Sequence, residues 1–172
     1  MSSSHDSEIP ANGQQVITAV AFIWRRQSNQ FELFSPRRAL TKKFLPGKFE
    51  LVGGHVDFGE QPEDALKREV IEELGQKIIV DELVSSFTYI NEIKGSHSLE
   101  LVYLARFESP ETEVKLNPED HVEYKWTNKP ETIQLRGEDD AELPSILKGF
   151  DRLEQLSKLG QLPGQKEEAR YV

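Results

Sequence analysis

Three glutamates, Glu69, Glu72 and Glu73, lie within five residues of a segment with helical spacing. Each residue of a helix advances by about 100°, so all three carboxylates point to the same side. Like charges at these spacings destabilise an isolated helix by about a few tenths of a kcal/mol per pair. A divalent cation would reverse the sign of that contribution, because Mg²⁺ binds carboxylate oxygens and completes its coordination with water and phosphate. The cluster therefore indicates a metal site suited to a phosphate-bearing ligand.

A helix that begins at Pro62 and ends at Gly75 is expected to carry these glutamates. Proline is tolerated at the first helical position, and Glu63 and Asp64 suit the positive end of the helix dipole. Gly75 suits the left-handed conformation that ends many helices. The apolar residues of the segment fall beside the carboxylates and are expected to face the core: Leu66, Val70, Ile71 and Leu74. Without further context, a solvated surface would explain the same glutamates, because Glu is a good helix former.

The remaining segments predict a sheet and one more helix. Six segments with β-branched, aromatic or alternating composition are predicted to be strands: 15–24, 31–38, 48–54, 77–90, 97–107 and 121–127. The second helix is predicted over 141–159, where apolar residues at helical spacing are expected to dock on the sheet: Ile146, Leu147, Phe150, Leu153, Leu156 and Leu159. Strands combined with two separated helices predict an α/β sandwich of one domain.

The composition fits one soluble domain with a single core. The chain has 172 residues, of which 37% are hydrophobic and 30% are charged. We expect flexible ends over 1–15 and 161–172 and one domain over 16–160. The chain has no cysteine, which excludes disulfides and thiolate metal sites. No apolar run approaches the roughly 18 residues of a membrane span, and the N-terminus has no secretory signal pattern, so the cytoplasm is the expected location.

The net charge of −9 argues against a non-specific grip on nucleic acid, which requires a basic face. An anionic ligand must therefore be bound locally, by a metal or by a few basic side chains. The basic cluster of the sequence directly precedes the glutamates and comprises Arg37, Arg38, Lys42, Lys43 and Lys48. Arg37, Arg38 and Lys48 are our candidates for binding substrate phosphates. A solvated loop that balances neighbouring acids is the alternative interpretation.

The glutamates belong to a longer pattern that resembles the box of the Nudix hydrolase family. That box has the form G-x5-E-x7-R-E-U-x-E-E-x-G-U, in which U is a bulky aliphatic residue. Here Gly54, Glu60 and Arg68 take the first three fixed positions, and "REVIEELG" follows without a gap. Gln76 stands where the last aliphatic residue is expected, which is the one departure. The resemblance covers the box closely and the order of strands more loosely.

The resemblance implies a Nudix-type α/β/α sandwich with a central mixed sheet. It also implies hydrolysis of a nucleoside diphosphate linked to a moiety X, with Mg²⁺ or Mn²⁺ as the cofactor. By the same resemblance, Glu69, Glu72 and Glu73 are metal ligands together with the carbonyl of Gly53, and Glu72 and Glu73 are also catalytic. The other box residues have structural roles: Gly54, Glu60, Arg68 and Gly75. Of these, Arg68 is expected to pair with Glu60.

The general base and the moiety X stay open. Family members often supply a glutamate from a loop downstream of the box, and within 117–126 we favour Glu123, then Glu119. As substrate we favour a nucleoside triphosphate, with ADP-ribose, other nucleotide sugars and dinucleoside polyphosphates as alternatives. A module that senses a nucleotide without cleaving it is the competing class. The expected partner is thus a nucleotide-derived small molecule, without nucleic acid or membrane, and the oligomeric state stays open, with a homodimer among the options.

Overall fold

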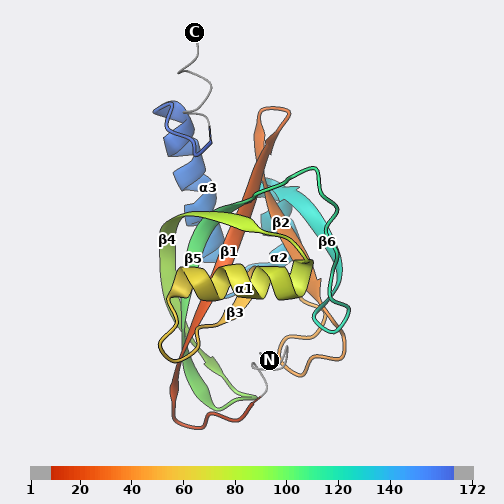
Figure 1. Cartoon of the computed structure of the whole chain (residues 1–172), viewed down its shortest axis with the longest axis vertical. Coiled ribbons are helices and arrows are strands. Elements are labelled where there is room, and N and C mark those ends of the chain that lie inside the picture. Colours follow the sequence, from red (N-terminus) through yellow and green to blue (C-terminus); the bar gives the residue numbers. More distant parts are fainter. Residues whose placement is uncertain (1–8, 165–172) are drawn as a thin grey trace.

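Six strands form one sheet in the computed structural model, which describes residues 9–164 (Figure 1). The strands are β1 (Gln15–Gln27), β2 (Gln30–Arg38), β3 (Val52–His55), β4 (Ile78–Asn91), β5 (Ser96–Phe107) and β6 (His121–Asn128). Their order is β4-β5-β1-β2-β6, and β3 pairs with β1 beside this path. β1 and β5 are parallel, whereas β1–β2, β1–β3, β2–β6 and β4–β5 are antiparallel. The sheet is therefore mixed, as expected.

Strand β1 lies at the centre of the sheet and is buried on both faces. Side chains of a strand alternate between its two faces, so residues 19–24 contact two hydrophobic cores in turn. Helix α1 (Pro62–Leu74) covers the core that contains Ala19, Ala21 and Ile23. Helix α3 (Leu143–Lys158) covers the core on the other face, which contains Val20, Phe22 and Trp24. This α/β/α arrangement confirms the predicted fold class and explains the nearly continuous apolar run of β1.

Helix α1 begins at Pro62 and ends before Gly75, as predicted. Gly75 has a left-handed φ of 63° and donates its N–H to the carbonyl of Ile71. The core-facing residues are fully buried: Leu66, Val70 and Leu74. Each stabilises the fold by about 1.5–3 kcal/mol relative to an exposed position. The prediction that Ile71 faces the core is wrong, because Ile71 lies at the edge of the apolar arc and is 48% exposed.

Helix α3 docks on the other face of the sheet. Its core residues match the prediction: Ile146, Phe150, Leu153 and Leu156. Phe150 packs edge-on against Phe22 of β1, with ring centroids 5.0 Å apart, and Leu147 is half-buried. The prediction that Leu159 docks on the sheet is wrong. Leu159 lies beyond the last helical residue and is 59% exposed.

A further helix, α2 (Lys129–Arg136), was not predicted, so residues 9–164 contain three helices rather than two. Its start carries a capping box. The Asn128 side chain accepts a hydrogen bond from the N–H of Glu131, and the Glu131 side chain accepts one from the N–H of Asn128. Together with Pro130 in the first turn, this pattern marks a helix start that could have been recognised. The last residue of α2, Arg136, lines the cavity that also contains the glutamates of α1.

The described ends of the chain pack against the domain. Ala11 is buried and donates its N–H to the carbonyl of Lys94, and Leu162 is buried in the core under α3. The parts of the predicted flexible ends over 1–8 and 165–172 lie outside the described residues.

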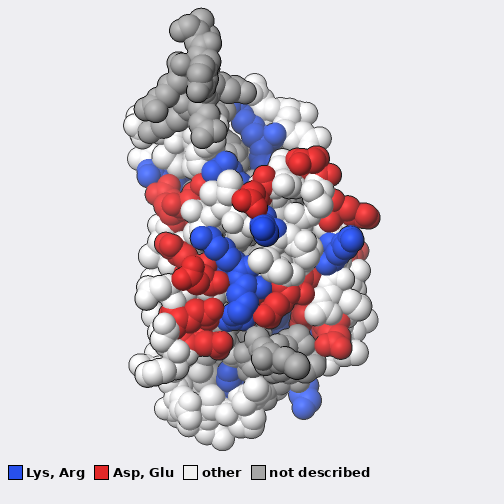
Figure 2. Space-filling view, viewed as in Figure 1, with Lys and Arg blue, Asp and Glu red and all other residues white. Residues whose placement is uncertain are grey.

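Acidic and basic side chains are mixed over the face of the molecule that carries α1 (Figure 2). On this face, lysines and arginines are separated by aspartates and glutamates rather than gathered into one basic surface. None of the helices within residues 9–164 is long and apolar enough to cross a membrane.

Candidate metal and diphosphate site

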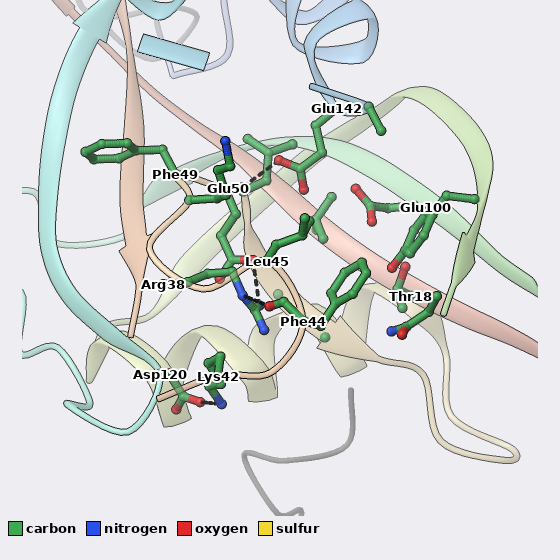
Figure 3. A pocket seen from close by; sticks show the side chains of 18 of the residues that line it. Thr18, Arg38, Lys42, Phe44, Leu45, Phe49, Glu50, Glu100, Asp120 and Glu142 are labelled. Carbon is green, nitrogen blue, oxygen red and sulfur yellow. Dashed lines mark hydrogen bonds and ion pairs between the residues drawn. The ribbon is translucent and has the colours of Figure 1, made fainter. Parts of the chain in front are cut away.

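The three glutamates of α1 line a cavity of ≈ 830 Å³. Its walls come from β1, β3, β4, β5 and α1, from the last residues of β2 and α2, and from the loops that precede β3, β6 and α3. Gly53 and Gly54 of β3 line it beside α1. A cavity of this size is within the range of small-molecule pockets. Figure 3 shows further acidic side chains around it, from Glu50, Glu100 and Glu142.

The three carboxylates differ in exposure and in partners. Glu69 is buried, and its Oε1 lies 2.6 Å from Nη1 of Arg68. Glu72 is exposed and lies 3.7 Å from the same nitrogen. Glu73 has a buried oxygen, Oε2, without a hydrogen-bond partner. Buried side-chain oxygens are normally hydrogen-bonded, so this oxygen points to a missing positive or donating group.

The pKa of the Glu73 carboxyl is raised well above its usual value. Burial is the largest cause. Neighbouring carboxylates add to it, namely those of Glu50, Asp120 and Glu69, whereas a hydrogen bond from the Gly53 backbone opposes it. The ionised form of Glu73 is therefore destabilised by low dielectric and by three negative neighbours. A cation beside this carboxylate would remove that destabilisation.

Strand β3 brings its backbone directly against Glu69. A Cβ atom on Gly54 would lie 2.6 Å from Cδ of Glu69, closer than real Cβ contacts come. Antiparallel pairing with β1 fixes this approach, since Gly54 lies opposite Ala19 and Gly53 opposite Val20. Only glycine at position 54 allows α1 to hold Glu69 so close to the strand.

Arg68 ties the loop before α1 to the helix. Its Nε and Nη2 donate to Oε1 and Oε2 of Glu60 at 3.0 and 2.9 Å, which is the pair expected from the sequence. Nη2 also donates to the carbonyl of His55 at 3.1 Å, and Nη1 donates to Glu69 at 2.6 Å. A planar guanidinium satisfies several acceptors at fixed angles. Arg68 therefore holds Glu69 in position relative to the loop.

Within residues 9–164, no three acidic, histidine or cysteine side chains converge into a ready-made metal site. The donor set nevertheless fits a hard cation, because Mg²⁺ and Mn²⁺ prefer oxygen ligands such as the three glutamates and the Gly53 carbonyl. The unpaired buried oxygen of Glu73 fits the same ligand type. The contact with Arg68 does not prevent Glu69 from binding an ion, because a carboxylate accepts several partners.

The predicted phosphate-binding residues are separated in the structure. Arg37 does not line the cavity, and its Nη1 donates to Glu123 at 3.0 Å. Arg38 lines the cavity, and its Nη1 donates to Glu50 at 2.8 Å, whereas its Nη2 is buried without a hydrogen-bond partner. Lys48 lines the cavity and is exposed. Two of the three predicted residues, Arg38 and Lys48, therefore line the cavity.

The two glutamates predicted as general base, Glu123 and Glu119, do not line the cavity. Glu123 is paired with Arg37, and its side chain is 45% exposed on β6. The loop acid that lines the cavity is Asp120, which is buried and lies 2.7 Å from Nζ of Lys42. Spacing could not distinguish these acids, because the partner of Asp120 is a lysine 78 positions away.

Glu50 lines the cavity, although no sequence pattern singled it out. Its Oε2 accepts a hydrogen bond from Arg38 at 2.8 Å, and its Oε1 lies 2.8 Å from Nε2 of His121. Burial acts to raise the pKa of Glu50, but Arg38 and His121 outweigh it and hold the pKa below its usual value. Glu50 is therefore ionised at neutral pH, and its charge contributes to the raised pKa of Glu73.

Gln76, the departure from the box, is buried and makes polar contacts. Its Nε2 donates to the carbonyls of Thr112 and Glu113, both at 2.9 Å. An aliphatic residue could not make these bonds, so the amide fixes the loop before β6 against the end of α1 by hydrogen bonding instead of apolar packing.

Comparisons with known proteins agree with this geometry. Residues 15–149 match the family model of the NUDIX domain. Nucleoside triphosphatase NudI of Escherichia coli is 35% identical over 98 residues, which cover 52% of this chain and 67% of that protein. The solved structure of a C. elegans Ap4A hydrolase binary complex has a TM-score of 0.66 at 26% identity and covers 81% of this chain and 98% of its own. The MutT protein from Methanosarcina mazei has a TM-score of 0.63 at 23% identity and covers 84% and 96%.

Proposed function

The chain belongs to the NUDIX family, and on that basis we propose that it is a divalent-cation-dependent pyrophosphohydrolase. The matched residues, 15–149, include the whole box and every strand of the sheet. In the proposed reaction, water attacks a phosphorus of the pyrophosphate in a nucleoside diphosphate linked to a further group. The P–O bond of the anhydride breaks, and the products are a nucleoside phosphate and the phosphorylated further group. Mg²⁺ or Mn²⁺ is the proposed cofactor.

The observation that carries this proposal is the environment of Glu73. Its Oε2 is buried without a partner, and burial and three neighbouring carboxylates raise its pKa. A buried charge among like charges is strongly destabilising unless a counter-ion binds beside it. A helix surface with no function would leave these glutamates in solvent, where the repulsion is weak. The burial of Glu73 therefore favours a cation site over a solvated surface.

Each residue of the site has a proposed role. Glu69 and Glu73 hold the cation together with the carbonyl of Gly53. A bound divalent cation polarises the phosphorus and lowers the pKa of a bound water. Glu72 is exposed, so its carboxylate can bind the cation or accept a proton from the attacking water. Lys48 contacts the phosphates, because it lines the cavity and its ammonium is a mobile point charge.

A nucleoside triphosphate is the substrate class that we propose. The support is the name of the E. coli relative, a nucleoside triphosphatase that is 35% identical over the matched residues. A dinucleoside polyphosphate is the second candidate, supported by the Ap4A hydrolase of C. elegans at 26% identity. Both contain a polyphosphate that a cation and Lys48 would hold in the same way. The residues that select between the two substrate classes must therefore lie in the rest of the cavity.

Chromatographic measurement of the nucleotide products formed from a panel of substrates tests the proposal. The panel contains nucleoside triphosphates, nucleotide sugars including ADP-ribose, and dinucleoside polyphosphates, each with Mg²⁺, with Mn²⁺ and with a chelator. We expect cation-dependent cleavage of nucleoside triphosphates. Faster cleavage of another class would replace the proposed substrate, and tight nucleotide binding without any cleavage would instead support a sensor.

A further inference from the structure

We propose that the part of the cavity away from α1 binds the nucleobase, and that Glu100 accepts a hydrogen bond from an exocyclic amino group of that base. This inference deepens the proposed function and rests on a nucleoside triphosphate as substrate. The site is built by residues that the box does not contain: Phe44, Tyr89, Glu100, Arg136 and Glu142. All of them line the same cavity as the glutamates of α1.

Two aromatic rings form one wall of this part of the cavity. Phe44, in the connection between β2 and β3, and Tyr89, on β4, have ring planes only 14° apart and centroids 6.1 Å apart. Tyr89 lies opposite Ser98 in the pairing of β4 with β5, so the sheet fixes the position of this residue. Parallel aromatic faces are surfaces on which nucleobases stack. The wall therefore suits a planar ring.

Glu100 presents an unsatisfied acceptor beside this wall. It lies on β5, is 5% exposed and lines the cavity. Its Oε1 is buried and has no hydrogen-bond partner. Leaving a buried acceptor without a partner is costly, and a ligand that supplies a donor gains what the free protein lacks. The unpaired oxygen is the second observation that points to a ligand at this place.

Glu100 faces a second carboxyl group across the cavity. Figure 3 shows the carboxyl groups of Glu100 and Glu142 turned toward one another. Glu142 is anchored, because its Oε2 accepts from Nη1 of Arg136 at 2.6 Å and from the N–H of Leu51 at 3.0 Å. Burial and the nearby carboxyl of Glu142 raise the pKa of Glu100 well above its usual value. Because Glu142 is held by Arg136 and Leu51, the unpartnered Oε1 of Glu100 stays available as an acceptor.

An amino group fits this acceptor better than an oxo group does. Carboxyl groups of Glu50, Glu142 and Asp140 also line the cavity, and a carbonyl oxygen of a base directed at them would be repelled. An exocyclic amino group projects beyond the edge of the ring, and its N–H groups donate hydrogen bonds. It can therefore reach an oxygen that is shielded from solvent. Adenine and cytosine present such a group beside a ring nitrogen.

Matched substrates that differ only in this amino group test the inference. Adenosine triphosphate is compared with purine riboside triphosphate, and cytidine triphosphate with the triphosphate of pyrimidin-2-one riboside. For the full chain we expect kcat/KM to be about tenfold or more higher for the amino-bearing member of each pair. Binding of the corresponding nucleoside monophosphates, measured by calorimetry, gives the same comparison without cleavage of an anhydride bond.

Three variants assign the effect to Glu100. Glu100→Leu removes the acceptor at similar volume, so the preference is expected to fall to within about twofold. Glu100→Gln keeps a carbonyl oxygen as the acceptor, so the preference is expected to persist. Glu111→Leu, at an exposed position outside the cavity lining, is the control and should keep the preference of the unchanged chain. Thermal unfolding shows whether each variant is folded.

The outcomes separate this inference from the proposed function. Equal kcat/KM and equal binding for the members of each pair, or a preference that survives in Glu100→Leu, would overturn the base site. If no triphosphate is cleaved but the monophosphates bind with the expected preference and the expected response to Glu100→Leu, the base site is supported and the proposed hydrolysis fails.

Discussion

Gly54 and Glu69 are in direct contact across the junction of β3 and α1, since a Cβ on Gly54 would lie 2.6 Å from Cδ of Glu69. The contact with Glu69 thus explains why position 54 of the box is a glycine. The strand and the helix approach so closely that the carboxylate occupies the space of a side chain. The cation site therefore depends on a backbone position as well as on its carboxylates.

Gly54→Ala is expected to lower turnover by about tenfold or more while the chain stays folded. The added methyl group must displace the carboxylate of Glu69, whose position relative to Arg68 would change, whereas the core under α1 is not touched. The measurement is kcat at saturating cation together with the thermal unfolding midpoint. Full activity in this variant would show that the position of Glu69 is not required.

Replacing the predicted loop bases is expected to have little effect. Glu123→Gln and Glu119→Gln should each keep turnover within about threefold, because neither residue lines the cavity. Glu72→Gln should lower turnover by about tenfold or more, since its carboxylate lies beside the other two on α1. Steady-state kinetics of the three variants on one substrate gives the comparison. A large loss in Glu123→Gln would support Glu123 as the general base.

Glu100 should make the stability of the fold depend on pH. Its pKa is raised in the folded state by burial and by Glu142, with Glu50 adding to it and Arg136 opposing it. A carboxyl with a raised folded pKa contributes its full stabilisation below the unfolded pKa of about 4.3 and loses it as pH rises through the folded pKa. Glu100→Gln cannot ionise, so its advantage in unfolding midpoint over the unchanged chain should grow from pH 4 upward. A difference that is constant with pH would contradict this assignment.

The parts of the site that depend on neighbouring residues could be predicted from the sequence. The ends of α1 follow from Pro62 and Gly75, and the pair between Arg68 and Glu60 joins residues eight positions apart. Local spacing and helix geometry are sufficient for such contacts. The start of α2 also depends on neighbouring residues, because Asn128 and Glu131 form a capping box, but this helix was not predicted.

The parts that depend on long-range pairing could not be predicted. Glu50 contacts His121, which is 71 positions away. Asp120 pairs with Lys42, which is 78 positions away. Such contacts arise only once β2, β5 and β6 have assembled around β1, and their residue types carry no spacing that marks them. The same holds for the facing carboxyl groups of Glu100 and Glu142.

Turnover of Glu73→Gln, compared with Glu63→Gln, tests the central claim most directly. Glu63 lies on the first turn of the same helix and is exposed, so its replacement changes the same chemical group without touching the cavity. With Mg²⁺ or Mn²⁺ we expect Glu73→Gln to lose about a hundredfold or more in kcat and Glu63→Gln to stay within about twofold. In chelator, Glu73→Gln should unfold at no lower temperature than the unchanged chain, because it relieves the repulsion at a buried carboxylate. Retained activity in Glu73→Gln would contradict the assignment of this helix as the catalytic cation site.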